Sequence, residues 1–277
     1  MRAPSRNPIA LPDCVRARGG VRVVIGATPR GSAPLVIAES AGYRVRFPRV
    51  GGGCEGVLIN TGGGLAGGDR MEVDVEIGPR AAATLTTQAA EKIYRAEDVE
   101  TEVAVSLDLH AGSRLDWLPQ EQILFSGACL ARTLNVRMRG DATLTLVESA
   151  VFGRVAMGEV METGAFADRW RIRRDSHLIL AEEVRLDGPV SRILGRRAVA
   201  NGARAIATCL HVAVDAEARR DEARTALDGA ASECGITAQN GMLIARFLSP
   251  DPQALRADLA RYLEWLRGRP MPRSWQT

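Results

Sequence analysis

The sequence predicts a mainly β protein, a large irregular multi-stranded structure of stacked sheets with two α-helices in its C-terminal region. Short segments in which apolar and polar residues alternate dominate from residue 20 to about 215, and a period of two is typical of strands with one buried face. Clusters of Gly, Asp, Ser or Pro separate these segments at intervals of roughly eight to fifteen residues, as in sandwiches, barrels and stacked sheets. Helical periodicity is found only in the later part of the chain.

A chain of 277 residues can hold one large β domain or two small ones, and it can bury a substantial core. No exact internal repeat is found, so a regular solenoid is not predicted.

The first element to be explained is the glycine-rich stretch "VLINTGGGLAGGDRMEVDVEIG". Gly62, Gly64 and Gly67 fit the spacing of a dinucleotide-binding loop, which requires a helix after the glycines to hold the pyrophosphate. The segment 71–77 instead alternates between apolar and acidic residues, so the loop leads into a strand. We therefore expect no nucleotide site, and the pattern favours a glycine-rich turn between two antiparallel strands.

Further strands are predicted along the chain by the same alternation. They are expected at residues 102–109, 133–139, 142–147, 170–173, 178–180 and 209–212.

Two helices are predicted after these strands. Residues 215–232 are rich in Ala, Glu and Arg and carry a thin apolar stripe. Residues 251–267 have complete helix signals, with Asp251 as a cap, Pro252 at the first position and Gly268 after the last turn. The apolar face of this second helix, expected to pack against the core, consists of Leu255, Leu259, Tyr262, Leu263 and Leu266.

The bulk composition excludes several classes of protein. Lys and Arg number 36 against 33 Asp and Glu, and aromatics are 4%, so neither nucleic acid nor a membrane surface is an expected partner. The five cysteines are scattered and the three histidines stand alone, which fits neither a disulfide framework nor a zinc site. Without a signal peptide or a run of ~20 apolar residues, a cytoplasmic protein is expected.

Four carboxylates stand beside apolar segments. Asp69 closes the glycine loop, Glu121 lies in "LPQEQILF", Glu148 ends "TLTLVE" and Glu159 follows "FGRVAMG". A charge beside a buried strand costs free energy unless it is paired or hydrated. These residues therefore mark either polar sites with interior water or ion pairs with the many arginines.

Four segments together resemble the signature segments of the urease accessory protein UreD family, called UreH in some organisms. They are "GGGLAGGDR", "LTTQAAEKIYRA", "LDWLPQEQILFSGA" and "VFGRVAMGE", in the family's order and spacing between about residues 50 and 160. The segment "DRWRIRRDSHLILAEEVRL" fits the stretch that follows. The first 30 or so residues and the two helices add little to the match.

The resemblance implies a single UreD-like domain over residues 1–277 and a scaffold without catalysis of its own. Proteins of this family bind UreF, which recruits the GTPase UreG, and the assembly docks on apo-urease and passes nickel to its active site. The family's fold is a large irregular β structure with two helices. The resemblance thus implies no tightly bound cofactor, nickel in transit, and a dimeric assembly formed through UreF.

The resemblance also assigns motif positions and shows two departures. The expected partner or assembly residues are Gly67, Gly68, Asp69, Arg154, Gly158 and Glu159, and the glycines would permit close backbone packing where the β layers and a partner meet. Many members carry His-Pro-Pro where this chain has Asn60-Thr61-Gly62, so a histidine metal contact does not carry over. An acid is common where Ser126 stands, which weakens a carboxylate relay there.

Three functions are therefore considered. The first is a nickel-insertion scaffold with a water-filled path lined by Asp69, Glu121 and Glu148, since weak, exchangeable oxygen ligands suit passage of the ion. The second is a β-sandwich hydrolase with Glu121 and Glu148 as an acid/base pair. The third is a generic β interaction module without a metal role.

Overall fold

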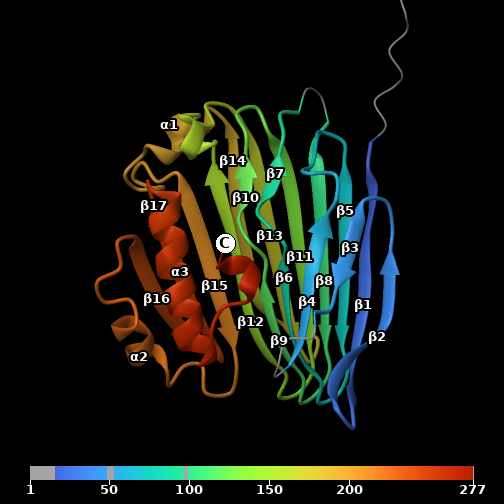
Figure 1. Cartoon of the computed structure of the whole chain (residues 1–277). Helices are drawn as coiled ribbons and strands as arrows, with labels where there is room; N and C mark the ends of the chain where they lie inside the picture. Colours follow the sequence, from blue (N-terminus) through green and yellow to red (C-terminus); the bar gives the residue numbers. More distant parts are fainter. Residues whose placement is uncertain (1–15, 49–52, 97–98, 277) are drawn as a thin grey trace, which may run out of the picture.

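The computed structural model describes residues 16–48, 53–96 and 99–276, and confirms a mainly β fold built from two stacked sheets (Figure 1). The seven-stranded sheet contains, in spatial order, β14 (His177–Gly188), β13 (Gly164–Arg174), β11 (Cys129–Met138), β8 (Thr101–Leu109), β5 (Arg70–Ile77), β1 (Arg18–Thr28) and β2 (Gly31–Glu39). The ten-stranded sheet follows the order β16 (Glu233–Gln239), β17 (Met242–Ser249), β15 (Ala205–Val212), β12 (Thr143–Phe152), β9 (Arg114–Leu118), β6 (Ala82–Thr87), β4 (Cys54–Asn60) and β3 (Tyr43–Arg46), with β10 (Gln122–Leu124) beside β12 and β7 (Glu91–Ile93) beside β10.

The central strands are wound, because the chain alternates between the two sheets. From β4 to β13 it makes four successive turns, β4–β5, β6–β8, β9–β11 and β12–β13, and each strand pairs in parallel with its counterpart in the turn before. No regular solenoid was predicted, because the sequence has no exact repeat, yet the chain winds through four stacked turns. Alternation alone requires only that each strand present one apolar face, so non-repeating segments can stack in this way.

The glycine loop is not a hairpin turn, and this expectation was wrong. It follows β4 of the ten-stranded sheet and precedes β5 of the seven-stranded sheet. The loop therefore crosses from one layer to the other. A pattern of period two identifies strands but does not say which sheet each strand joins.

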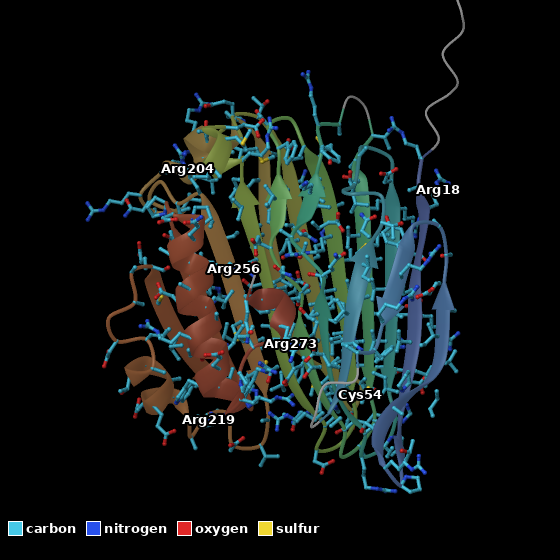
Figure 2. All side chains as sticks on the ribbon, viewed as in Figure 1. Arg18, Cys54, Arg204, Arg219, Arg256 and Arg273 are labelled. Atoms are coloured by element: carbon cyan, nitrogen blue, oxygen red, sulfur yellow. The ribbon has the colours of Figure 1, made fainter. Side chains whose placement is uncertain are left out.

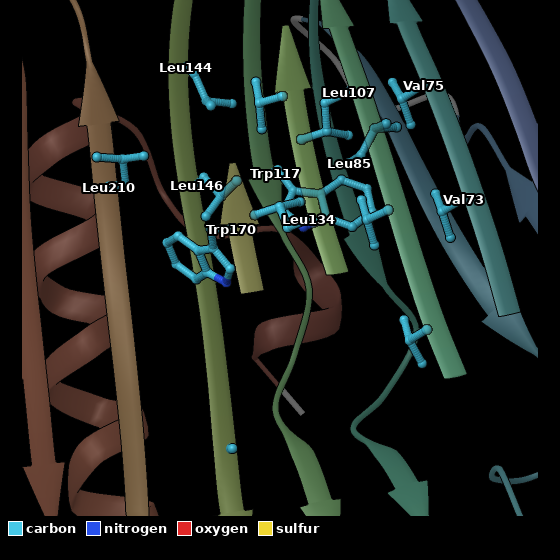
Figure 3. Close-up of a cluster of buried hydrophobic side chains, with 14 of the residues drawn as sticks. Val73, Val75, Leu85, Leu107, Trp117, Leu134, Leu144, Leu146, Trp170 and Leu210 are labelled. Atoms are coloured by element: carbon cyan, nitrogen blue, oxygen red, sulfur yellow. The ribbon is translucent and has the colours of Figure 1, made fainter. Parts of the chain in front are cut away.

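The main core lies between the sheets. Alternate residues of both sheets point into it, and its largest buried side chains include Trp170, Phe152 and Phe166. Figure 3 shows how Val73 and Leu107 of one sheet and Leu85 and Leu146 of the other meet in this layer. The buried aliphatic rows hold the two sheets together and place the loops at their ends.

Helix α3 (Pro252–Arg267) packs on the outer face of the ten-stranded sheet, and its bounds agree with the prediction. The Asp251 side chain accepts a hydrogen bond from the backbone N–H of Gln253, and Gly268 ends the helix at φ 64°. The apolar face of α3 forms a second core with the outward-facing residues of β9, β12, β15 and β17. The short helix η2 (Arg273–Trp275) follows, with Trp275 buried against the same sheet.

The predicted helix at 215–232 is much shorter in the structure. Only α2 (Arg220–Thr225) is helical, and most of the remaining residues form turns. Ala223 is the one residue that the helix buries. An alanine stripe offers little apolar area, so packing does not stabilise further turns.

Three short helices of the described residues were not predicted. They are η1 (Val155–Met157), after β12, α1 (Val190–Leu194), after β14, and η2, after α3. Within the described residues, no helix is long and apolar enough to cross a membrane.

Candidate functional site

The glycine loop is fixed by the side chain of Asn60, the last residue of β4. Its Oδ1 accepts a hydrogen bond from Gly62 N at 2.9 Å, and its Nδ2 donates to the carbonyl of Gly64 at 3.2 Å. The same Nδ2 donates to Glu91 Oε1 at 3.0 Å. Asn60, which stands where a histidine was considered, thus ties the loop to strand β7.

Gly67 and Gly68 are required by the loop for different reasons. Gly68 has φ 85°, in the left-handed region that favours glycine. Gly67 is buried and does not have a positive φ; it is required by close packing, because a Cβ at this position would lie 2.6 Å from the carbonyl oxygen of Val99. The loop therefore packs directly against the backbone that follows β7.

Asp69 closes the loop by binding backbone groups. Its side chain is 8% exposed, and its two oxygens accept hydrogen bonds from Ala17 N and Ala66 N, each at 2.8 Å. The bond from Ala17 holds the loop against the residue before β1, and the bond from Ala66 closes the loop on itself. The structure thus gives Asp69 a positioning contact within the loop.

A series of contacts between aromatic and arginine side chains connects the glycine loop to the segment after β12. The hydroxyl of Tyr94 donates to the carbonyl of Gly63 at 3.0 Å, and its ring meets Phe125 edge-on with centroids 5.0 Å apart. The guanidinium of Arg154 lies 4.5 Å from the centroid of the Phe125 ring, a cation–π contact. Segments that are far apart in the sequence are thereby joined in one surface.

Arg154 is also paired with Glu159. Arg154 Nε donates to Glu159 Oε2 at 2.7 Å, and the hydrogen bond to Arg154 lowers the pKa of Glu159 below its ordinary value. Gly158 ends η1 at φ 73°, which turns the chain so that these two side chains meet. The predicted residues Arg154, Gly158 and Glu159 therefore form one unit.

We call this region the signature surface, defined by Gly63, Tyr94, Phe125, Arg154, Met157 and Glu159. It lies at the end of the molecule where Figure 1 shows α1. Helix α1 packs beside the segment 152–162, and the hydroxyl of Ser191 donates to Glu162. Tyr94 and Met157 are 37% and 75% exposed. Exposed apolar side chains around a fixed arginine are typical of a protein-binding surface.

A cavity of about 250 Å³ lies between the sheets beside the glycine loop. Its polar lining includes Asn60 and Glu91, and burial raises the pKa of Glu91 to about 7. Tyr43 also lines it, and within the described residues its buried hydroxyl has no hydrogen-bond partner. An apolar cavity with these oxygen atoms can hold water or a small polar species.

Glu148 lies in a buried ionic cluster between the sheets. Arg132 of β11 binds Glu148 of β12 and, through Nε and Nη2, both oxygens of Asp168 of β13. Trp117 Nε1 donates to Glu148 Oε1 at 2.9 Å. Burial raises the pKa of Glu148, against the opposing effect of Arg132.

Glu121 lies on the other side of the ten-stranded sheet. Its carboxylate binds Arg256, which Figure 2 labels on α3, at 2.7 Å. The Arg256 guanidinium also lies 4.7 Å from the ring centroid of Trp275. Glu148 points into the space between the sheets, whereas Glu121 faces α3. The structure therefore does not bring these two carboxylates together as an acid/base pair.

The three carboxylates considered for a nickel path have separate surroundings. Asp69 binds backbone N–H groups, Glu121 binds Arg256, and Glu148 binds Arg132. In the part of the chain that the structure describes, no group of three or more His, Cys, Asp or Glu side chains could hold a metal ion. A role of these residues in metal transfer stays a prediction.

Sequence reasoning missed several residues that organise the site. Tyr94, Phe125 and Glu91 lie inside the quoted signature segments. None of the three was among the glycines, carboxylates and single arginine expected there to act in assembly or nickel transfer. An aromatic residue in a short strand suggests core packing. The sequence does not show which residue of a distant segment the ring contacts. Arg132, at an inward position of an alternating strand, carried a clearer signal, since a buried arginine needs a carboxylate.

Comparison with known proteins agrees with the motif resemblance. The family model described as "UreD urease accessory protein" matches residues 17–276. A urease accessory protein UreD of Azorhizobium caulinodans is 47% identical over 261 residues, covering 94% of this chain and 96% of that protein. A urease accessory protein UreD of Methylobacterium sp. (strain 4-46) is 48% identical over 269 residues, covering 95% of each chain. The "Urease accessory protein UreD 3" of Methylorubrum extorquens (strain PA1) is 46% identical over 284 residues, covering 99% of this chain and 95% of that protein. With the match extending over both sheets and α3, the chain belongs to the UreD family of urease accessory proteins.

Proposed function

We propose that this protein is a scaffold for urease maturation that binds UreF, through it recruits the GTPase UreG, docks on apo-urease and assists nickel insertion. Its family supports the role in maturation. The partners and the nickel step come from the resemblance of the signature segments. In this proposal the protein performs no catalytic step, and any dependence on GTP belongs to UreG.

One observation carries the proposal: the signature segments meet in a single surface. Gly63, Tyr94, Phe125 and Arg154 come from four segments and form a continuous series of contacts. Core packing alone would not require a half-exposed Tyr94 or an exposed Met157 at this place. A rigid surface of this kind supports docking of a protein partner, which we take to be UreF.

The docking proposal is tested with Met157→Asp. Met157 is 75% exposed and η1 contains no buried residue, so the variant should fold normally. It should reduce co-purification of UreF by about tenfold or more, because a carboxylate replaces an apolar anchor.

The matched control for this test is Val214→Asp. Val214 is 85% exposed and follows the end of β15 that pairs with the start of β12, whereas the signature surface follows the other end of β12. This control should retain UreF. Equal UreF binding by the Met157→Asp and wild-type proteins would contradict docking at the signature surface.

Nickel transfer along carboxylates is a second part of the proposal, with Asp69, Glu121 and Glu148 as the path residues. Glu121→Gln and Glu148→Gln preserve volume but offer poorer ligands to a divalent cation. If these residues act in transfer, each variant should bind UreF normally and lower the nickel content of the activated urease. Full nickel loading by a stable, complex-forming variant would remove that residue from the path.

The hydrolase alternative finds no support in the geometry. Glu121 and Glu148 face opposite sides of the ten-stranded sheet, whereas paired glycosidase carboxylates flank one bond at about 5–9.5 Å from each other.

A generic interaction module without a metal role would give full urease activation by every carboxylate variant. Micromolar binding of NAD or GTP to the isolated protein would contradict the scaffold proposal.

A further inference from the structure

The cavity beside the glycine loop holds a carboxylate without a counter-cation. Glu91, the first residue of β7, lines this cavity, and the neutral amide of Asn60 donates from Nδ2 to its Oε1 at 3.0 Å. Within the described residues, no guanidinium or ammonium group is hydrogen-bonded to Glu91, whereas the buried Asp116 and Glu148 each bind an arginine. Holding a carboxylate away from water without a cation costs free energy, and burial accordingly raises the pKa of Glu91 to about 7.

Tyr43 supplies a second unsatisfied group in the same cavity. It lies on β3 opposite Asn60 of β4 and is 4% exposed. In the part of the chain that the structure describes, its buried hydroxyl has no hydrogen-bond partner. Burial, and then the charges of Glu91 and Asp69, raise the pKa of Tyr43, so the hydroxyl is neutral and close enough to be influenced by both carboxylates. A buried hydroxyl of this kind needs a ligand or an ordered water.

The other groups of the cavity wall limit what can bind. Both N–H groups of the Asn60 amide are already used, by Glu91 and by the carbonyl of Gly64. A ligand must therefore bring its own donors, and Glu91 favours one with a positive charge. Apolar side chains also line the cavity, among them Val21, Leu58, Met71 and Val73.

The size of the cavity and its donor set favour a small organic cation. Its volume of about 250 Å³ is the share of about eight water molecules in the liquid, so a ligand of up to about eight non-hydrogen atoms fits. Among the described residues, no three His, Cys, Asp or Glu side chains gather here, and one carboxylate is a poor ligand set for a divalent metal ion. One carboxylate is, however, sufficient to neutralise a singly charged ammonium group.

We propose that this cavity binds a primary ammonium group carried on a short apolar stem. The ammonium group donates to the Glu91 carboxylate and to the Tyr43 hydroxyl, and the stem packs against the apolar wall. A free small amine and the lysine side chain of a docked protein share this chemistry. The site goes beyond the proposed scaffold role, since it requires neither UreF nor nickel.

The first test is an NMR titration of the isolated full chain with butylammonium chloride at about pH 8, where Glu91 is ionised. The wild-type protein should bind this amine with a Kd of about 0.1–10 mM. The backbone N–H signals of Asn60 and Gly63, which line the cavity, should shift. The neutral 1-butanol has the same number of non-hydrogen atoms and should bind at least about tenfold more weakly at the same ionic strength.

The second test repeats the titration with variants of the two unsatisfied groups. Glu91→Gln keeps an acceptor for Asn60 but removes the charge, and it should weaken binding of butylammonium by about tenfold or more. Tyr43→Phe removes one hydrogen bond and should weaken binding by about two- to tenfold. The matched control is Glu72→Gln. Glu72 lies on β5 between Met71 and Val73 of the cavity wall but is exposed on the other face of the sheet, so this variant should bind as the wild type does.

A third titration distinguishes the two sources of the ammonium group. Nα-acetyl-lysine methylamide carries the same four-carbon stem, attached to a peptide backbone. Binding of this compound as tight as that of butylammonium means that the cavity admits a lysine side chain of a partner. Binding of butylammonium alone means that the ligand is a free amine, and either result supports the site.

Four results would overturn the proposal. They are no binding of either amine up to about 50 mM, equal binding of butylammonium and 1-butanol, equal binding by the Glu91→Gln and wild-type proteins, and shifts confined to residues outside the cavity.

Discussion

At the scale of single residues, Gly67 and Gly68 have different physical requirements although they are neighbours. Gly67 lies where a side chain would meet the Val99 carbonyl, and Gly68 has a positive φ with only the Arg16 side chain near its Cβ position. The first constraint is a collision with backbone and the second is conformational strain.

We expect the free energy of unfolding to fall by about 1–3 kcal/mol more in Gly67→Ala than in Gly68→Ala. Two controls separate the causes. Gly202 has φ 84° and open space, and Gly235 has neither a positive φ nor a neighbour within 4 Å. Gly202→Ala should therefore resemble Gly68→Ala, and Gly235→Ala should cost little. Urea unfolding measures all four, and equal losses for Gly67→Ala and Gly235→Ala would refute the collision.

Glu91 leads to a prediction about pH. Burial raises its pKa from the ordinary 4.5 to about 7, so below pH 4.5 both the folded and unfolded states are protonated and above pH 7 both are ionised. Above pH 7 the folded protein holds a half-buried carboxylate. The free energy of unfolding therefore falls as pH rises through 7. Glu91→Gln keeps an acceptor for Asn60 and removes this loss. Its stability relative to wild type should increase by on the order of 2 kcal/mol between pH 5 and pH 8. A difference independent of pH, measured by thermal unfolding in the two buffers, would contradict it.

At the scale of elements, the C-terminal segment after α3 completes the outer layer of the ten-stranded sheet. Trp275 Nε1 donates to the carbonyl of Leu118 at 3.1 Å, and Arg269 Nη2 donates to Asp116 Oδ2. The segment therefore covers polar and apolar groups of β9 that would otherwise face water. Its contribution is packing as well as hydrogen bonding.

We expect Trp275→Ala to lower the free energy of unfolding by about 3–5 kcal/mol, because it leaves a cavity against β6 and β9 and an unpaired Leu118 carbonyl. Arg273→Ala, two residues earlier and exposed, should change it by less than about 0.5 kcal/mol. Denaturant titration of both variants gives the comparison. A Trp275 variant as stable as the Arg273 variant would mean that the tail is not part of the folded layer.

At the scale of the whole molecule, the cluster around Arg132 joins the two sheets through charge. Arg132 and Asp168 belong to the seven-stranded sheet, and Glu148 and Trp117 belong to the ten-stranded sheet. One arginine between two carboxylates leaves the buried cluster dependent on that single cation.

Arg132→Leu should therefore destabilise the protein by about 3–5 kcal/mol, since it leaves two buried carboxylates without a counter-charge. Glu148→Gln should cost about 1–2 kcal/mol at most, because Arg132 keeps both oxygens of Asp168. Calorimetric melting of the two variants decides the order. A reversed order would show that Glu148, and not Arg132, holds the cluster together.

The sequence predicted those parts of the fold that depend on local pattern. Helix α3 was correct to its bounds because Asp251, Pro252 and Gly268 are local signals. The winding between sheets could not be predicted, because alternation in β5 or β8 gives the buried face but not the partner strand. The signature segments marked the region of the site, whereas the contact of Tyr94 with Phe125 and of Phe125 with Arg154 depends on the fold.

The cover that α3 forms over the ten-stranded sheet bears on how the protein is completed during synthesis. The turns from β4 to β13 can pair as they emerge, because each strand finds its neighbour in the turn already made. Among the residues that the structure describes, α3 and the segment after it pack on the outer face of β9 and β12, with Leu118 and Val147. Because α3 and the residues after it follow all the strands in sequence, this apolar face stays uncovered until residues 252–275 have been made and have folded. Until then, the partly made protein exposes an apolar sheet face to which other proteins can bind.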